Sequence, residues 1–142
     1  MIKISVPVYK RSENKLQALK DTIDVAAYTI QMCENSNIFP KKCRFTLCTR
    51  LIDSCLDSIV KIRQANKIRP TNKEQAKQRL NLQYQVILNF EAMWGMMTVA
   101  YELYSIPSHK IDVWSQKLLT ADECVSAWRK SDMLKFKEQF TA

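Results

Sequence analysis

Residues 47–62 read LCTRLIDSCLDSIVKI, and the spacing of their apolar side chains indicates the fold class. Apolar residues recur at steps of three and four, which places them on one side of a helix. These residues are Leu47, Cys48, Leu51, Ile52, Cys55, Leu56, Ile59 and Ile62. Charged residues fall on the opposite side, so the stretch predicts an amphipathic helix with Cys48 and Cys55 as small core residues.

Prolines bound this helix and three others. The chain has 142 residues and four prolines, at positions 7, 40, 70 and 107. Proline is tolerated at helix starts and disfavoured in helix interiors, so each long stretch between prolines is open to a helix. The spacing of three and four also recurs in 16–33 and 111–128. We therefore predict one domain, 1–142, with helices at about 13–36, 43–67, 72–104 and 108–131.

Short connections predict how these helices are arranged. The connections near 35–41, 66–71 and 105–108 are short, and short loops between long helices give antiparallel neighbours. The expected fold class is all-α, an up-down-up-down antiparallel four-helix bundle. Apolar and polar residues alternate near the N-terminus, so residues 1–12 are expected to form a short extended arm. Residues 132–142 are expected to form a charged C-terminal tail.

The third predicted helix begins with a capping sequence and then becomes apolar nearly all round. Residues 71–74 read TNKE, which resembles a capping box that joins Thr71 to Glu74. Apolar side chains then cover most of the helix circumference in 86–104. Such a helix needs burial on more than one side, so we expect a subunit interface here. The candidate interface residues are Phe90, Trp94, Met97 and Tyr101.

Positive charge is concentrated in one part of the chain. The net charge is +8, and residues 41–80 hold 11 Lys and Arg against three acidic residues. Two interpretations stay open: a solvated helix face with internal pairs such as Asp57–Lys61, or a surface that tracks phosphates. The candidate nucleic-acid-binding residues are Lys41, Lys42, Arg44, Arg50, Lys61, Arg63, Lys67 and Arg69. Phe45 is the only aromatic residue between Lys41 and Arg79, so base-specific reading of a single strand is not indicated.

Several classes of function lack the residues that they need. A single glycine cannot form a phosphate-binding loop, and five cysteines without a C-x-x-C pair offer neither a zinc site nor a disulfide framework. The single histidine, His109, has no spacing that recommends a Cys–His pair. We therefore expect no enzyme, metal or cofactor, and reduced thiols favour the cytoplasm. Polar residues interrupt the apolar stretch 86–104, so we expect no membrane span.

Residues 39–47, FPKKCRFTL, resemble the loop-to-second-helix signature of a family of small four-helix-bundle proteins. The family includes proteins encoded within 23S rRNA intervening sequences and the accessory variability determinant (Avd) proteins of diversity-generating retroelements. VPVYK at 6–10 and AWRKSD at 127–132 resemble the Avd-like branch. The ribosomal branch usually has glycine where this chain has Cys48. Its later PANIAEG-like stretch is absent from 57–62, which also favours the Avd-like branch.

This resemblance implies a non-catalytic accessory protein that enables mutagenic reverse transcription. It implies a homopentameric ring whose basic surface binds the reverse transcriptase and its template RNA or cDNA. Within the matched signature, Lys41, Lys42 and Arg44 are the candidate polyanion contacts. The other five candidate cations come from the charge pattern alone. The alternative function is a structural or interaction bundle of the 23S rRNA intervening-sequence type, without a nucleic-acid role.

Overall fold

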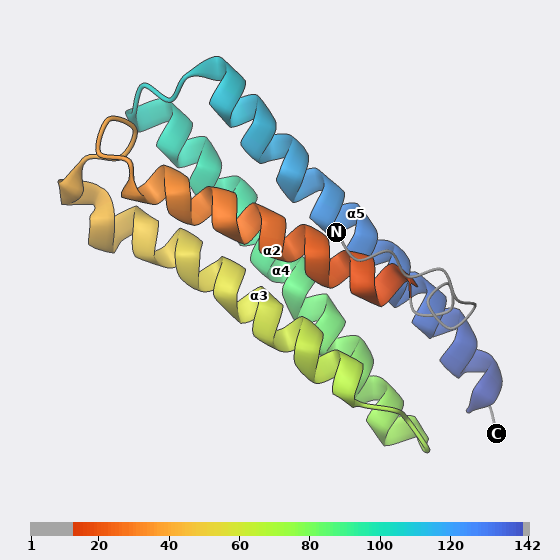
Figure 1. The fold of residues 1–142 in the computed structure, drawn as a ribbon. Coiled ribbons are helices and arrows are strands. Elements are labelled where there is room, and N and C mark those ends of the chain that lie inside the picture. The colour runs from red at the N-terminus through yellow and green to blue at the C-terminus, as the bar shows by residue number, and fades with distance from the viewer. Residues whose placement is uncertain (1–12, 141–142) are drawn as a thin grey trace.

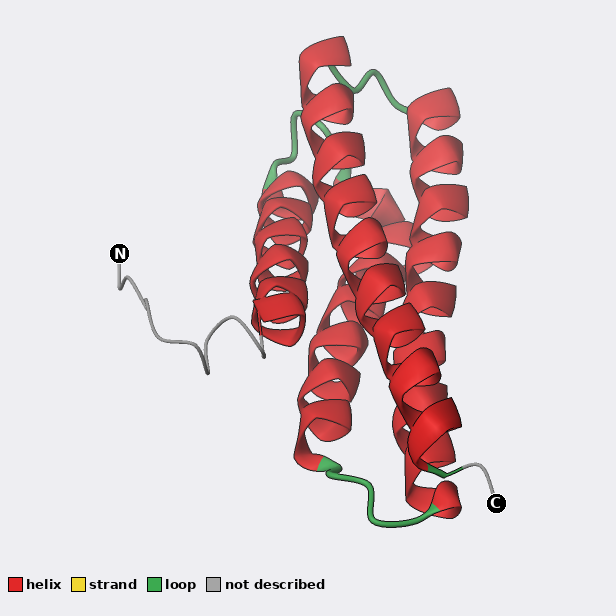
Figure 2. Ribbon diagram, turned by 90° about the vertical axis from the view of Figure 1, so that its right-hand side faces the viewer, coloured by secondary structure: helices red, strands yellow, loops and turns green. Residues whose placement is uncertain are grey.

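The computed structural model describes residues 13–140, with side chains from residue 17 onward. Regular structure in this part of the chain is all helical and strand-free, with four long α-helices (Figures 1 and 2). They are α2 (Glu13–Glu34), α3 (Thr49–Lys67), α4 (Lys73–Leu103) and α5 (Ser108–Gln139). The fold class is therefore all-α and compatible with a four-helix bundle. The predicted arm at 1–12 lies outside the described residues.

Each long helix packs against two others. α2 contacts α3 and α5, and α4 also contacts α3 and α5. The α2–α3 and α4–α5 connections lie at one end of the molecule, and the α3–α4 connection lies at the other (Figures 1 and 2). None of the helices within residues 13–140 has the length and apolar character needed to cross a membrane.

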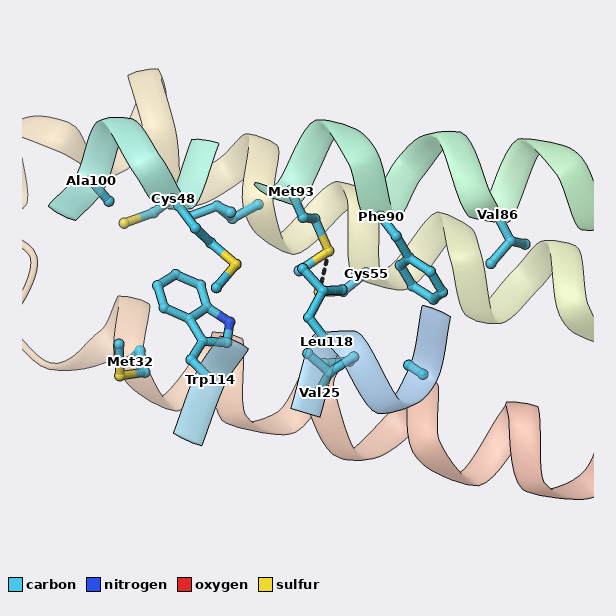
Figure 3. Close-up of a cluster of buried hydrophobic side chains, with 14 of the residues drawn as sticks. Val25, Met32, Cys48, Cys55, Val86, Phe90, Met93, Ala100, Trp114 and Leu118 are labelled. Atoms are coloured by element: carbon cyan, nitrogen blue, oxygen red, sulfur yellow. Dashed lines mark hydrogen bonds between the residues drawn. The ribbon is translucent and has the colours of Figure 1, made fainter. Parts of the chain in front are cut away.

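Trp114 of α5 lies in the core near the end that carries the α2–α3 connection (Figure 3). Its side chain is 0% exposed, and its ring meets that of Phe39 edge-on at a centroid distance of 6.2 Å. Its indole N–H donates to the hydroxyl of Thr29 at 2.8 Å, which joins α5 to α2. Farther along the core, the Cys55 thiol donates to the Met93 sulfur at 3.6 Å. The prediction that Cys48 and Cys55 are small core residues is confirmed.

Helical structure begins immediately after Pro40, slightly before the predicted residue 43. A short 3-10 helix, η1 (Lys41–Cys43), leads into a π-helix, η2 (Arg44–Cys48), which continues into α3. The Thr49 hydroxyl donates to the Arg44 carbonyl at 2.8 Å, spanning the wide π turn. Single π turns are rare and often occur at functional sites. The π turn therefore marks this end of the molecule as a candidate functional region.

The cap of α4 differs from the predicted capping box by one residue. Asn72, rather than Thr71, is the N-cap, and its side-chain oxygen accepts from the backbone N–H of Gln75 at 2.9 Å. The Gln75 side chain in turn accepts from the backbone N–H and the hydroxyl of Thr71. The prediction that Glu74 closes the box is therefore wrong, because Gln75 occupies the third helical position.

The outward face of α4 also differs from the predicted interface. Phe90 and Met97 are 0% and 3% exposed, because both pack into the core of this chain. They are unavailable to a second subunit, so their assignment as interface residues is wrong. Trp94 is half-buried and Tyr101 is exposed. The large exposed apolar residues of α4 are Tyr84, Leu88, Val99, Tyr101 and Leu103.

The predicted C-terminal tail is helical over 132–139, because α5 continues to Gln139 instead of ending near residue 131. Asp132 and Phe136 extend its buried stripe and are 7% and 6% exposed. One carboxylate oxygen of Asp132 accepts from Arg79 Nε at 2.8 Å and from Gln83 Nε2 at 2.7 Å. These long-range contacts hold the last turns of α5 against α4. Residues 141–142 lie outside the described part of the chain.

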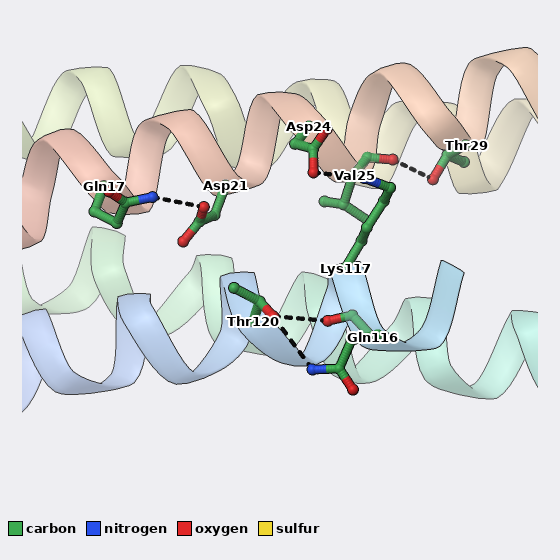
Figure 4. A network of polar contacts seen from close by, with 8 residues as sticks. All are labelled: Gln17, Asp21, Asp24, Val25, Thr29, Gln116, Lys117 and Thr120. Carbon is green, nitrogen blue, oxygen red and sulfur yellow. Dashed lines mark hydrogen bonds and ion pairs between the residues drawn. The ribbon is translucent and has the colours of Figure 1, made fainter. Parts of the chain in front are cut away.

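Polar contacts also join α2 to α5 (Figure 4). The Lys117 ammonium donates to the Asp24 carboxylate at 2.8 Å and lies 5.7 Å from the centre of the Tyr28 ring. On α2, the Thr29 hydroxyl donates to the Val25 carbonyl at 2.7 Å. The positive charge of Lys117 is therefore balanced within the bundle rather than left for an external anion.

Candidate nucleic-acid interface

The predicted cations separate into groups at opposite ends of α3. Lys41, Lys42 and Arg44 precede the helix and are called the end cluster, whereas Arg63, Lys67 and Arg69 lie at or beyond its C-terminal turns. α3 contains 19 residues, so at about 1.5 Å per residue its ends are about 28 Å apart. The screening length in physiological salt is about 8 Å. The two groups therefore act as separate positive fields.

Buried residues between the cations fix the orientation of the end cluster. Cys43 and Cys48 are 1% and 4% exposed, and Leu47 is also buried, whereas the three cations face solvent. The Cys43 thiol donates to the Pro40 carbonyl at 3.0 Å and lies 3.9 Å from the Cys48 sulfur. The backbone of this segment is thus anchored by its inward face. The cations project from a fixed turn at the end that also carries the α4–α5 connection (Figure 1).

No carboxylate offsets the end cluster from nearby in the sequence. Residues 35–52 contain no Asp or Glu. Within residues 17–140, ion pairs engage Lys61, Lys77, Arg79 and Lys117 but no member of the end cluster. The charge of the end cluster is therefore available to an anion that arrives from solvent.

Lys61 is in a different situation from the other candidates. Its ammonium lies 3.0 Å from Asp57, which confirms the predicted pair. Asn89 of α4 also donates to the Asp57 carboxylate, at 2.9 Å. Burial acts to raise the pKa of Asp57, but the hydrogen bonds from Asn89 and Lys61 outweigh it and hold that pKa below its ordinary value. The charge of Lys61 is balanced, so it is the weakest candidate of the eight.

The remaining candidates do not join the end cluster. Arg50 is exposed on the first turn of α3, and Arg69 is exposed in the α3–α4 connection. Arg63 and Lys67 line an open hollow of about 420 Å³ together with residues of α2 and α3. The hollow is also lined by Leu19, Val60, Gln64 and Asn66. This hollow lies toward the C-terminal end of α3, opposite the end cluster, and forms a separate surface.

Sequence reasoning misjudged two residues near these cations. Phe45 directly follows Arg44 and is 83% exposed, although it had no predicted role. The sequence did carry a signal for this exposure, because Phe45 falls outside the helical spacing that links Cys43, Leu47 and Cys48. Arg79 was counted with the basic segment, yet it is 9% exposed and bonded to Asp132. Arg79 therefore contributes to the fold rather than to an anion-binding surface.

The chemistry of the buried thiols disfavours a cysteine nucleophile. Burial raises the pKa of Cys55 to about 11, although a hydrogen bond with Thr29 partly offsets this effect. Burial, reinforced by neighbouring thiols, also raises the pKa of Cys33 well above its ordinary value. A thiolate is the reactive form of cysteine, so these shifts lower the share of thiolate at Cys33 and Cys55 near neutral pH. Within the described residues, no three His, Cys, Asp or Glu side chains gather in a way that could hold a metal ion.

The chain has no match among protein-family models, curated proteins or solved structures. Among the eight candidate cations, the end cluster is the group that combines proximity in the chain, exposure and the absence of Asp or Glu nearby in the sequence. The end cluster is therefore the candidate nucleic-acid interface.

Proposed function

We propose that the chain is a non-catalytic, cytoplasmic accessory protein of the Avd type in a diversity-generating retroelement. It binds the reverse transcriptase and the template RNA or cDNA, and so enables mutagenic reverse transcription. One observation carries the proposal: the end cluster offers three exposed cations from an acid-free segment on an anchored turn. Lysine and arginine that neutralise phosphates release counterions, which favours binding to any nucleic acid. The link to a retroelement comes from the sequence resemblance.

The proposal includes an up-down-up-down bundle topology and a homopentameric ring. The order of helix contacts and the chain path in Figure 1 support the topology. Exposed apolar residues on α4, including Leu88 and Val99, support self-association. Between them lies Gly95, the only glycine of the chain, where an added Cβ meets nothing within 4 Å. A glycine inside a helix costs about 1 kcal/mol of stability relative to alanine. Close approach of a second subunit would explain why glycine is present at this position.

Native mass spectrometry at low salt, with and without a structured RNA, tests the assembly. The expected result is a five-subunit species that retains RNA, because the apolar face of α4 is covered and the basic surface is repeated around the ring. The number five comes from the resemblance alone. A monomer at micromolar concentration contradicts the assembly. A pentamer that ignores RNA contradicts the nucleic-acid role and favours the purely structural alternative.

Replacing Lys41, Lys42 and Arg44 together by glutamine tests the end cluster. RNA binding is expected to weaken. The slope of log K against the logarithm of the salt concentration is expected to become shallower by about 0.7–0.9 for each phosphate that is no longer neutralised. The helical circular dichroism signal is expected to stay unchanged, because all three side chains face solvent. Fluorescence anisotropy with a labelled RNA over a range of salt concentrations measures both the affinity and the slope.

A matched variant separates a local site from a general charge effect. Lys130, Lys135 and Lys137 are exposed on the C-terminal half of α5, far along the chain from the end cluster. Their joint replacement by glutamine removes the same charge and is expected to weaken RNA binding much less. Equal losses of affinity in the two triple variants rule out a localised site. Unchanged affinity after removal of the end cluster places RNA binding elsewhere.

A further inference from the structure

Phe45 is the most exposed large apolar residue in the described part of the chain, at 83%. Burial would remove its apolar surface from water, so leaving the ring in solvent forfeits a stabilising contribution. Within residues 17–140, aromatic ring pairs involve Phe39, Tyr104, Trp114, Phe136 and Phe140. In this part of the chain, no other aromatic ring therefore covers Phe45.

Local contacts hold Phe45 in this outward position. Cys43 and Leu47, two residues away on either side, are buried and anchor the segment. The Thr46 hydroxyl donates to the Cys43 carbonyl at 3.4 Å, and the Thr49 hydroxyl donates to the Arg44 carbonyl at 2.8 Å. Both hydrogen bonds join a residue before Phe45 to a residue after it, and so they close the turn across this position. The ring is presented on a fixed backbone rather than on an unstructured loop.

We propose that Phe45 is a stacking platform for an unpaired base of single-stranded nucleic acid, and that the end cluster holds the adjacent phosphates. The inference rests on the proposed function and specifies its ligand, a single strand of RNA or cDNA rather than a duplex. Aromatic platforms combined with basic side chains are the usual way in which proteins bind single strands. In a duplex the bases already stack on one another, so the ring finds no free base face.

The composition of the surface favours this ligand over a purely apolar protein partner. Each nucleotide joins a flat apolar base to a phosphate, and the surface joins one ring to cations that precede it in sequence. Arg44 is adjacent to Phe45, and Lys41 and Lys42 precede it by about one helical turn. Every base has a stacking face, so this contact carries no base specificity. A purely apolar protein partner has no use for three unpaired cations.

Replacing Phe45 by alanine tests the stacking contact. The probes are labelled single-stranded oligo(U) and oligo(dT), an RNA duplex of the same length, and heparin, which has charge but no bases. Affinity for both single strands is expected to fall about 5- to 150-fold. Affinity for the duplex and heparin, and the salt slope, are expected to stay unchanged, because the end cluster is intact. Phe45→Trp is expected to keep the affinity, and its added fluorescence to be quenched by single strands.

Leu134→Ala is the matched control, because Leu134 is 61% exposed on α5 and its removal also takes away exposed apolar surface. It is expected to leave all four affinities unchanged. If the wild-type protein binds none of the probes, the proposed function and the stacking contact both fail. If it binds and Phe45→Ala binds single strands as tightly, the stacking contact alone is overturned. Equal losses of affinity for single strands, duplex and heparin overturn it as well.

Discussion

Replacing Trp114 by alanine is expected to lower the free energy of unfolding by about 3–5 kcal/mol. The indole is 0% exposed, so its removal leaves a cavity whose lining side chains have no atoms to pack against. The substitution also removes the edge-on contact with Phe39 and the hydrogen bond to Thr29. Urea unfolding followed by circular dichroism, at matched protein concentrations, measures the difference. Because the free energy of unfolding of a domain is only about 5–15 kcal/mol, this loss is a large fraction of the total.

Three further variants show whether the loss of stability comes from burial. Trp114→Phe keeps most of the ring volume and is expected to cost less than the alanine variant. Val113→Ala, at an exposed neighbouring position, is expected to change stability by no more than about 0.5 kcal/mol. Trp94 is half-buried, so Trp94→Ala is expected to cost less than Trp114→Ala. A Trp114→Ala protein as stable as the Val113→Ala protein contradicts this account of the core.

The helices were predictable because their apolar residues repeat with the period of the helix itself. In the last helix, the predicted stripe within 111–128 is buried at Trp114, Leu118, Ala121, Val125 and Trp128. Its first residue, Ile111, is partly buried. The outward face of α4 was not predictable in the same way. A helix that is apolar nearly all round has no sequence signal for which side meets its neighbours. Packing against α3 and α5 determines which side of α4 is buried, and it buries Phe90 rather than Leu88.

The position of the candidate site was predictable from the sequence. Which of the cations are paired with carboxylates was not. The excess of lysine and arginine is a local property of the sequence, so the end cluster could be named from it. The balance of charge at Lys61 also depends on Asn89, a residue of another helix that bonds to Asp57. Similarly, Arg79 is paired with Asp132, the first residue of the predicted charged tail, and is buried rather than exposed on the surface. Such long-range pairing has no signature in local composition.

Replacing Asp132 by leucine is expected to lower the free energy of unfolding by about 3–5 kcal/mol, because the change leaves a buried guanidinium without its carboxylate. Arg79 is 9% exposed, with its guanidinium carbon 5.6 Å and 5.8 Å from the ring centres of Trp128 and Phe136. It keeps only the Ile68 carbonyl as an acceptor within the described residues, at 2.9 Å. Gln83 loses the same partner, although its side-chain oxygen already lacks one in that part of the chain. Urea unfolding again measures the effect.

A double-mutant cycle with Arg79→Met separates the pair from the single side chains. If the main cost of Asp132→Leu is an uncompensated buried charge, the double variant is expected to recover much of the lost stability, because two apolar side chains replace both charges. Additive losses of stability in the double variant contradict that explanation and indicate poorer packing instead. Glu138→Leu, at an exposed position on the same helix, is the control and is expected to be nearly neutral. A nearly neutral Asp132→Leu protein would mean that α5 is held against α4 without this pair, and that its last turns depend on apolar contacts such as those of Phe136.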